Sequence, residues 1–567
     1  MLNGIAASDG IGIGRVMLIE EASLEYTPKA LTDPDEESKR FRNAVKIFCD
    51  NTKAQADVLR ESTGNKEAEI LEGHIQMISD PYLSSEIEKL ISDGQCAESA
   101  LEHMCDMFIA MFSATDDELT KQRAADVRDV KTGILSILLG VREIKISAAP
   151  KGTVLVAKEL TPSMTAGINK DNIVGIVTET GGKNSHSAIL ARALEIPAVL
   201  SLNGAVTKLT AGETVIVDGN SGEVIASPEE SLIRKYEQKR KKFLDERNEL
   251  EAYRGRKTVS QSGEEYELFC NIAQPDGALR VVDYDGEGVG LFRTEFLFMD
   301  RNSAPSEQEQ FEAYKKTVLM LGGKPLVIRT LDIGGDKDIP CIGMEKEENP
   351  FMGFRAIRYC LKNKDIFTDQ LRAVLRASAY GDIRIMFPLV TTVEEFSEGK
   401  RIVEDIKNEL REKKIEFDKN IKIGLMIETA SSAVIADLLA READFFSIGT
   451  NDLTGYTMSC DRGNSKVSYL YSPFHPSVLR LIKHIIECGM RHNIPVGMCG
   501  EAAANNMMIP LLISFGLTEF SVSVPSVLKV RKAISQWTKS EADKIAEKVM
   551  AMTTEKEICD YLTTVIK

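Results

Sequence analysis

Residues 257–567 contain eight short apolar runs, and each run is followed by a segment with helical periodicity. In chain order the runs are YELFCNI, GVGLFRTE, PLVIRTLD, IRIMFPLV, KIGLMIET, FFSIGTND, PVGMCGE and EFSVS. A strand followed by a helix, repeated eight times, is typical of a closed parallel barrel. We therefore predict a C-terminal (β/α)8 barrel of the TIM type over this range.

Polar residues fall at the C-terminal ends of these runs. They are Asn271, Arg293, Glu295, Arg329, Asp332, Glu428, Asn451, Asp452, Cys499 and Glu501. Barrels of this kind carry their chemistry on the face formed by the carboxyl ends of the strands. Chance would not gather arginines, carboxylates and a cysteine on one rim, so we expect a catalytic or binding site there.

The first half of the chain changes pattern twice. Residues 1–20 resemble strands, the next stretch is helical, and short β-branched runs return after residue 150, with GNSG between the last two indicating a hairpin. We predict an α/β multidomain protein. Its parts are a small α/β domain (1–20 plus 148–229), an inserted helical bundle (21–147), a linker helix (230–256) and the barrel (257–567).

Composition and charge narrow the class of protein. The chain has 567 residues, which is too many for a single hydrophobic core to organise. Its net charge of −16 argues against nucleic acid or an anionic membrane surface as a partner. No apolar run approaches the roughly 20 residues needed to cross a bilayer, and the first residues lack the pattern of a signal peptide. Ten scattered cysteines without CxxC spacing are typical of reduced thiols. We expect a cytoplasmic protein.

His186 follows a Gly181-Gly182 turn and begins a helical stretch, with a serine on each side. A helix N-terminus offers free N–H groups and the positive end of the helix dipole, which would stabilise a phosphoryl group on the imidazole. The same field disfavours the imidazolium and keeps the ring nucleophilic. The pattern leaves two interpretations open: a histidine that carries phosphorus, or a partly exposed capping residue.

Arginines near the barrel rim are candidates for binding an anionic substrate. They are Arg293, Arg329, Arg355 and Arg462. The guanidinium group suits bidentate binding of phosphate and carboxylate oxygens. Each arginine alone is more often part of a surface ion pair, and only their joint placement favours a binding site.

Three further rim residues have side chains suited to chemistry. Glu428 and Asp452 end consecutive strand runs, where hard oxygen ligands suit Mg²⁺, although capping or a salt bridge would also explain them. Cys499 ends the PVGMCGE strand run. Its thiol could donate a proton to carbon, or it could be a small buried hydrophobe.

Several longer strings identify a family. KELTPSMTAG, GGKNSHSAILAR, RTEFLFMDR, RTLDIGGDK, ENPFMGFRAIR, FFSIGTNDLT, DRGN and GMCGE are similar to segments of Enzyme I, the phosphoenolpyruvate (PEP)–protein phosphotransferase that starts the bacterial sugar phosphotransferase system. The resemblance covers essentially the whole chain in order. It implies a cytoplasmic enzyme that transfers the phosphoryl group of PEP to its own histidine.

The resemblance also implies a role for each candidate. His186 is the phosphorylated residue, Thr165 orients its ring, and Cys499 is the general acid that protonates the enolate of pyruvate. Glu428 and Asp452 bind Mg²⁺. The residues expected to bind PEP are Arg293, Arg329, Arg355, Asn451, Arg462 and Lys337.

The resemblance further implies a partner. The helical insertion contains EAEILEGHIQMISDPYL and RAADVRDV, which are similar to the part of Enzyme I that binds HPr, a small histidine phosphocarrier. His74 lies here, and we expect it to be structural or interfacial. Because His186 must serve both PEP and HPr, the small domain is expected to swing about its linkers. The family forms a homodimer through its barrel.

Four positions depart from the family pattern. Asn184 replaces Thr, Ala430 replaces Pro, Gly455 replaces Gln and Ala504 replaces Gly. They support one alternative, a regulatory paralogue that binds PEP or a carrier with little turnover. A second alternative, a pyruvate dikinase-type enzyme, needs an ATP-binding domain, and no phosphate-binding glycine loop is present in the helical insertion.

Overall fold

The computed structural model describes two compact units, Met1–Arg247 and Asn248–Lys567. The described residues are 2–19, 24, 26–28, 31, 33–62, 65–113, 118–141, 146, 149–160, 164, 168–182, 185–299, 301, 303–334, 344, 347–461, 464 and 466–566.

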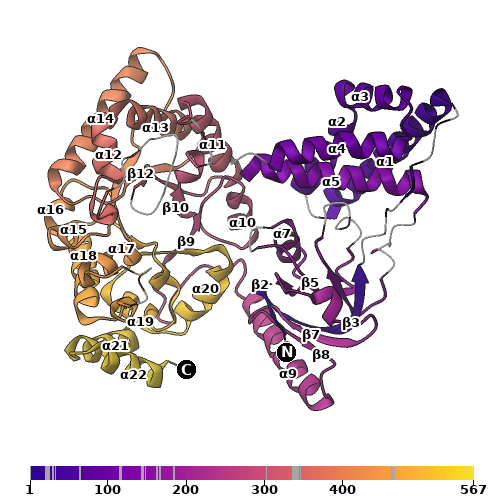
Figure 1. Ribbon diagram of the computed structural model, residues 1–567. Coiled ribbons are helices and arrows are strands. Elements are labelled where there is room, and N and C mark those ends of the chain that lie inside the picture. Colours follow the sequence, from indigo (N-terminus) through magenta and orange to yellow (C-terminus); the bar gives the residue numbers. More distant parts are fainter. Residues whose placement is uncertain are drawn as a thin grey trace. The chain divides into compact units, whose positions relative to one another are not determined.

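The first unit contains an eight-stranded mixed sheet (Figure 1). In spatial order its strands are β1 (Leu2–Asn3), β8 (Glu223–Ala226), β7 (Thr214–Asp218), β3 (Ile11–Ile19), β4 (Thr153–Ala157), β5 (Ile173–Thr178), β6 (Ala198–Leu200) and β2 (Ile5–Ser8). β3 is parallel to β4 and antiparallel to β7. This confirms that the N-terminal strands pair with the segment beyond residue 150. β7 and β8 form the predicted GNSG hairpin, with Gly222 at φ 80°.

Both faces of this sheet are buried. Along β4, Leu155 and Ala157 join one apolar cluster, whereas Val154 and Val156 join another. Successive side chains of a strand point to opposite faces, so the two clusters lie on opposite sides of the sheet. This explains why β4 reads as an unbroken apolar run rather than an alternating one.

The stretch predicted to be helical forms a helical bundle. Its helices are α1 (Pro34–Ser62), α2 (Asn65–Ile78), α3 (Pro81–Ser92), α4 (Ala97–Ser113) and α5 (Glu118–Leu139). α1 packs against α2 and α5, and α4 packs against α5 (Figure 1). Phe41, Ile87, Leu101 and Ile134 are among the buried residues of their common core.

Three more helices belong wholly or largely to the first unit. They are α7 (His186–Ala193), α8 (Ala205–Lys208) and α9 (Glu230–Glu251). Near its start α9 buries Tyr236 against Ile11, Ile216 and Ile225 of the sheet. The helix ends five residues before the limit predicted for the linker, and the boundary between the two units lies within it.

The second unit is built on a closed parallel barrel. Its strands are β9 (Glu267–Ile272), β10 (Val289–Arg293), β11 (Leu326–Arg329), β12 (Ile383–Phe387), β13 (Lys422–Ile427), β14 (Phe446–Ile448), β15 (Val496–Met498) and β16 (Glu519–Ser523). β9 pairs with both β10 and β16, which closes the barrel. All eight predicted runs form barrel strands, so the predicted fold class is confirmed.

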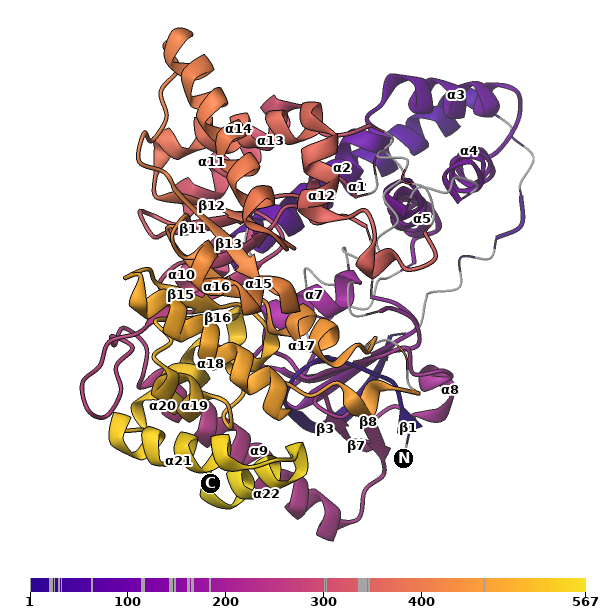
Figure 2. The ribbon, with the colours of Figure 1, turned by 90° about the vertical axis from the view of Figure 1, so that its left-hand side faces the viewer.

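Helices surround the barrel (Figures 1 and 2). They are α10 (Gly277–Asp283), α11 (Glu307–Met320), α12 (Ala356–Lys362), α13 (Lys364–Ala377), α14 (Val393–Glu412), α15 (Ala430–Val434), α16 (Ala436–Leu439), α17 (Thr450–Met458), α18 (Pro476–Arg491), α19 (Ile509–Phe515), α20 (Val527–Ser535), α21 (Lys539–Ala551) and α22 (Glu555–Val565). Capping boxes begin several of them, for example at Ser306 with Glu309 and at Thr392 with Glu395. α19 packs against α21 (Figure 2).

The barrel has separate inner and outer cores. Leu291, Val327, Met386 and Met426, from four neighbouring strands, form an apolar cluster of their own. Their chain neighbours belong to the large cluster between strands and helices. The first set therefore fills the barrel interior. In the described part of the chain, no helix is both long and apolar enough to cross a membrane.

Candidate active site

Most of the predicted site residues of the barrel lie at the carboxyl ends of its strands. Arg293 and Arg329 are the last residues of β10 and β11, and Glu428 and Cys499 directly follow β13 and β15. Asn451 and Asp452 lie in the first turn of α17, soon after β14 ends. They share one end of the barrel because all eight strands are parallel.

Arg329 is buried between two carboxylates. Its guanidinium pairs with Glu295 and, at 3.0 Å, with Asp332, and only 7% of the residue is exposed. Burial alone would lower the pKa of Arg329, but the charges of Glu295 and Asp332 outweigh it and raise that pKa. The arginine is therefore a fixed positive charge at the rim.

Arg355 extends the same cluster. It pairs with Asp332 at 2.9 Å and with Asp452 at 3.4 Å, and it donates a hydrogen bond to the hydroxyl of Tyr456 at 3.3 Å. Gly334 makes room for it: a Cβ there would lie 2.4 Å from the Cβ of Arg355, and the φ of 112° also favours glycine. The close approach of Arg355 therefore explains why the first glycine of the RTLDIGGDK string, Gly334, is needed.

Glu428 is 2% exposed and accepts a 2.6 Å hydrogen bond from the backbone N–H of Leu389. Leu389 has φ 53°, a left-handed conformation that costs energy in a leucine. Burial and the charges of Asp452 and Asp332 together raise the pKa of Glu428 to about 8, against the opposing charges of Arg329 and Arg355. The carboxyl therefore lacks sufficient positive charge nearby.

The donor set fits a hard divalent cation. The cluster holds four carboxylates (Glu295, Asp332, Glu428 and Asp452) against the two buried guanidiniums of Arg329 and Arg355. Among the residues that the structure describes, no group of three or more His, Cys, Asp or Glu side chains has metal-binding geometry. Mg²⁺ does not need one, because it binds to one or two carboxylates and completes its octahedron with water and substrate oxygens.

Cys499 is 5% exposed, and its Sγ lies 3.8 Å from the carbonyl oxygen of Ile448. Burial raises the pKa of its thiol to about 11, while the Ser447 hydroxyl and the charges of Arg329 and Arg293 favour the thiolate. This pKa lies above the ordinary thiol value of about 8.5. The thiol is protonated at neutral pH, which a proton donor requires.

Asn451 and Arg293 border this cluster. The Asn451 amide donates to Glu501 at 3.4 Å and accepts from its backbone N–H at 3.4 Å. Arg293 is exposed, and its charge reaches the Cys499 thiol. Gly500, beside Cys499, is required by packing, because a Cβ would lie 1.8 Å from the Thr450 hydroxyl oxygen.

His186 is the first residue of α7 in the other unit. Ser185 caps this helix, since its hydroxyl accepts from the Ala188 N–H at 3.4 Å. Gly181, in the turn before it, has φ 106°, which favours glycine. The predicted position of the histidine at a helix N-terminus after a glycine turn is confirmed. Its side chain is not among the described atoms.

The structure leaves some predicted residues aside. Thr165, Lys337 and Arg462, as well as the departure at Asn184, lie outside the described residues. His74 is buried in the helical bundle, with ring nitrogens 3.5 Å and 3.8 Å from carboxylate oxygens of Asp126 and Asp129 on α5. It holds α2 against α5.

Three residues that shape the cluster had no predicted role. Glu295 and Asp332 were recognised only as rim residues, although Glu295 pairs with Arg329 and Asp332 pairs with both arginines. Tyr456 was missed. It accepts from Arg355 and donates to the carbonyl oxygen of Phe351. Its position one turn after Asp452 on α17 was the available signal.

Comparisons with known proteins agree along the whole chain. Residues 3–123 match the model of the PEP-utilising enzyme N-terminal domain, residues 149–222 that of the mobile domain and residues 247–539 that of the PEP-binding domain. The phosphoenolpyruvate-protein phosphotransferases of Priestia megaterium and Bacillus subtilis (strain 168) are each 43% identical to the chain. The alignments cover 99% and 100% of it and 98% and 100% of the relatives. That of Listeria innocua is 44% identical over 99% of the chain and 98% of the relative. The chain belongs to the phosphoenolpyruvate–protein phosphotransferase family, Enzyme I.

Proposed function

We propose that this chain transfers the phosphoryl group of PEP to His186 and then to the histidine of an HPr-type phosphocarrier, releasing pyruvate. The observation that carries the proposal is the convergence of Arg329, Arg355, Glu428 and Asp452 at one end of the barrel. Family membership supports the same reaction.

PEP would bind to the cationic part of the cluster. Arg293, Arg329, Arg355 and Asn451 are the described residues proposed to hold its phosphate and carboxylate, together with Lys337 and Arg462. Glu295 and Asp332 keep two of these guanidiniums in place before substrate arrives. Such preorganisation lowers the cost of arranging charge in the transition state.

Glu428 and Asp452 are proposed to hold Mg²⁺, whose role when bound would be to neutralise charge on the transferring phosphoryl group and the departing enolate. The two carboxylates would themselves place negatively charged oxygen atoms at the carboxyl ends of the barrel strands, where PEP is proposed to bind. The raised pKa of Glu428 and the excess of carboxylates support this assignment, because a nearby cation would relieve both.

The chemical step breaks the bond between phosphorus and the enol oxygen of PEP and forms a bond between phosphorus and a ring nitrogen of His186. The electron pair of the broken bond goes to the enolate of pyruvate. The thiol of Cys499 then gives its proton to the enolate carbon, and solvent restores that proton. Thr165 is proposed to orient the imidazole for attack.

The proposed partners and location follow from the family and the charge. A net charge of −16 suits a basic protein carrier docking on the helical bundle. A homodimer through the barrel is supported by exposed apolar side chains such as Val434, Leu438 and Tyr469. A cytoplasmic enzyme fits thiols that are free at every described cysteine.

The departures from the family pattern remove no proposed ligand. Ala430 begins α15, and Gly455 lies within α17, where a Cβ would meet the Cys460 carbonyl oxygen at 3.3 Å and the Tyr471 ring at 3.9 Å. Ala504 ends a short 3₁₀ helix. Nothing at these positions favours a paralogue with little turnover over the enzyme.

The test is direct phosphorylation. Purified chain is mixed with PEP labelled at phosphorus and with Mg²⁺, beside His186→Ala. We expect acid-labile label on the wild type only, and its passage to an added HPr-type carrier. Label on His186→Ala, or labelling that requires ATP, would contradict the proposal.

A further inference from the structure

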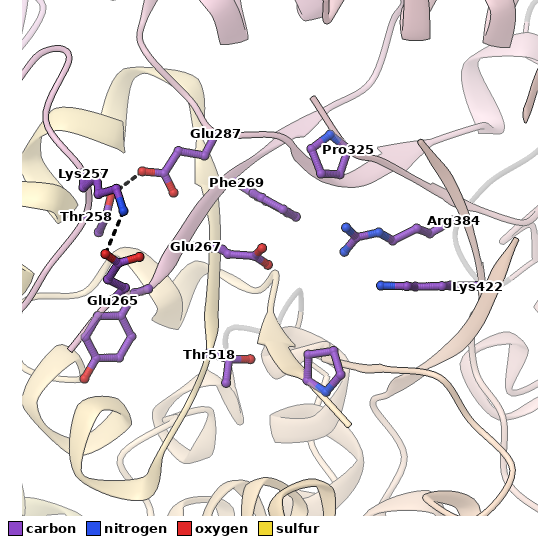
Figure 3. Close-up of a pocket in the computed structure, with 12 residues that line it drawn as sticks. Lys257, Thr258, Glu265, Glu267, Phe269, Glu287, Pro325, Arg384, Lys422 and Thr518 are labelled. Carbon is purple, nitrogen blue, oxygen red and sulfur yellow. Dashed lines mark hydrogen bonds and ion pairs between the residues drawn. The ribbon is translucent and has the colours of Figure 1, made fainter. Parts of the chain in front are cut away.

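The opposite end of the barrel, at the amino ends of its strands, contains a cavity. Its volume is about 520 Å³, a size that suits a small metabolite. The cavity is lined by residues from the start of β9, β12 and β13 and from neighbouring loops (Figure 3). None of its lining residues belongs to the proposed PEP site.

Charged side chains point into the barrel at this end. In β12 the large outer core takes Ile383, Ile385 and Phe387, so Arg384 faces inward. By the same alternation Glu267 of β9 and Lys422 of β13 face inward, because their chain neighbours Leu268 and Ile423 belong to the outer core.

Such side chains are unusual there, because barrel interiors are filled mostly by branched apolar residues. Nearer the carboxyl ends of the strands the interior is apolar, with Leu291, Val327, Met386 and Met426. A charged bottom layer around an open cavity therefore needs an explanation beyond packing.

The opposite charges in this layer face one another without meeting. In Figure 3 the Glu267 carboxylate points toward Arg384 and Lys422, which lie side by side across the cavity. Arg384 pairs instead with Asp382 at 3.0 Å, outside the layer. Within the described part of the chain neither Glu267 nor Lys422 forms an ion pair. Two positive groups and one negative group are thus separated by space that a ligand can fill.

A fourth inward residue lies beside Glu267, on the neighbouring strand β16. Glu519 of β16 is 8% exposed and has room because Gly290 and Gly497 lack a Cβ, which would come within 2.6 Å and 2.8 Å of its Oε1. Burial, together with the charge of Glu267, raises its pKa to about 8, and the charge of Arg384 opposes this rise. A cationic group near Glu267 would relieve this repulsion.

We propose that this cavity is a second ligand site, specific for a small zwitterion whose anionic group binds Arg384 and Lys422 and whose ammonium group binds Glu267. The class of ligand follows from charge complementarity, since the layer presents both signs on opposite walls. An amino acid or ω-amino acid has this character. The site is separate from PEP chemistry and does not depend on it.

The test uses a homologous series of unbranched ω-amino acids, from glycine to 6-aminohexanoate, with pentanoate and pentylamine as matched single-charge probes. Binding to the full chain is measured by titration calorimetry at neutral pH and low salt. We expect at least one zwitterion to saturate the site and both single-charge probes to bind about tenfold or more weakly, because each loses one of two charge contacts.

Two variants and a control locate the binding. Lys422→Gln and Glu267→Gln, both at exposed positions, should each weaken the zwitterion about tenfold. Lys419→Gln, an exposed lysine outside the cavity, should leave binding unchanged. Labelling of His186 by PEP should be equal in all three, so failure of the reaction and failure of this site give different results. No saturable binding, or binding that survives both variants, would overturn the proposal.

Discussion

At the carboxyl ends of the barrel strands, arginines and carboxylates close into buried ion pairs, whereas at the amino ends charges of both signs face each other across open space. At the first end Asp332 joins Arg329 and Arg355. At the other end Glu267 points toward Arg384 and Lys422 without pairing. The comparison shows that one barrel holds charge in two ways, in buried ion pairs at one end and as facing groups that do not pair with each other at the other.

The largest expected effect concerns Cys499, the proposed proton donor. Cys499→Ala should slow release of pyruvate from PEP about 10³-fold, because the enolate loses its acid. Cys270→Ala is the matched control: Cys270 is also buried, but it faces the outer core of the barrel. Pyruvate release is followed by coupled assay. Equal effects of the two substitutions would contradict a chemical role for the thiol.

Substitution of methionine for one arginine at each end of the barrel compares an arginine in buried ion pairs with one whose ion-pair partner is exposed. Arg355→Met should destabilise the barrel by about 3 kcal/mol, because it removes one of two guanidiniums from carboxylates that already outnumber them. Arg384→Met should cost about 1 kcal/mol or less, because its partner Asp382 is 45% exposed. Urea unfolding of both variants measures the difference. Similar losses would show that the ends of the barrel do not differ.

The buried carboxyl group of Glu519, at the amino ends of the strands, makes the stability of the barrel depend on pH. A folded-state pKa of about 8, above the ordinary 4.5, means that the folded protein holds a proton that the unfolded chain has released. The contribution to stability is complete below about pH 4.5 and is lost as pH rises toward 8. Glu519→Gln should therefore be more stable than wild type at pH 8, by about 2 kcal/mol, and closer to it at pH 5. Unfolding free energies at both pH values check this. A gain in stability of Glu519→Gln over wild type that is larger at pH 5 than at pH 8 would contradict the predicted direction of the pH dependence.

The smallest effect concerns a single hydroxyl. Tyr456→Phe removes the group that accepts from Arg355, and we expect the apparent affinity for PEP to fall about fivefold, or about 1 kcal/mol. Tyr266→Phe, at the lower cavity, should leave PEP kinetics unchanged. Steady-state kinetics of labelling separate the two. An unchanged affinity in Tyr456→Phe would mean that Arg355 does not depend on this contact.

Most of the residues at the carboxyl ends of the barrel strands could be predicted from sequence, because the pattern of each strand shows where that strand ends. Arg329, Glu428 and Cys499 were placed by counting to the end of each apolar run. The pairing of Asp332 with both arginines could not be predicted, since it depends on Gly334 allowing Arg355 to approach. The left-handed Leu389 behind Glu428 also has no sequence signal.

The charged layer at the amino ends of the strands was not predicted, for a different reason. Glu267, Arg384, Lys422 and Glu519 lie at or near the first residue of their strands, where charged residues usually face solvent. That they face inward follows only from alternation against the closed barrel, whose register is set by contacts between distant strands. The eight strands themselves were predictable because each is locally apolar.

The central claim is that the paired charges at the carboxyl end, and not those at the amino end, carry phosphoryl transfer to His186. It is tested most directly by single-turnover labelling from PEP in Arg329→Lys and Arg384→Lys, with His186→Ala as the blank. The account predicts a loss of about a hundredfold or more in the labelling rate for Arg329→Lys, because lysine cannot reproduce the bidentate contacts, and a wild-type rate for Arg384→Lys. Equal rates in the two lysine variants, or label on His186→Ala, would contradict it.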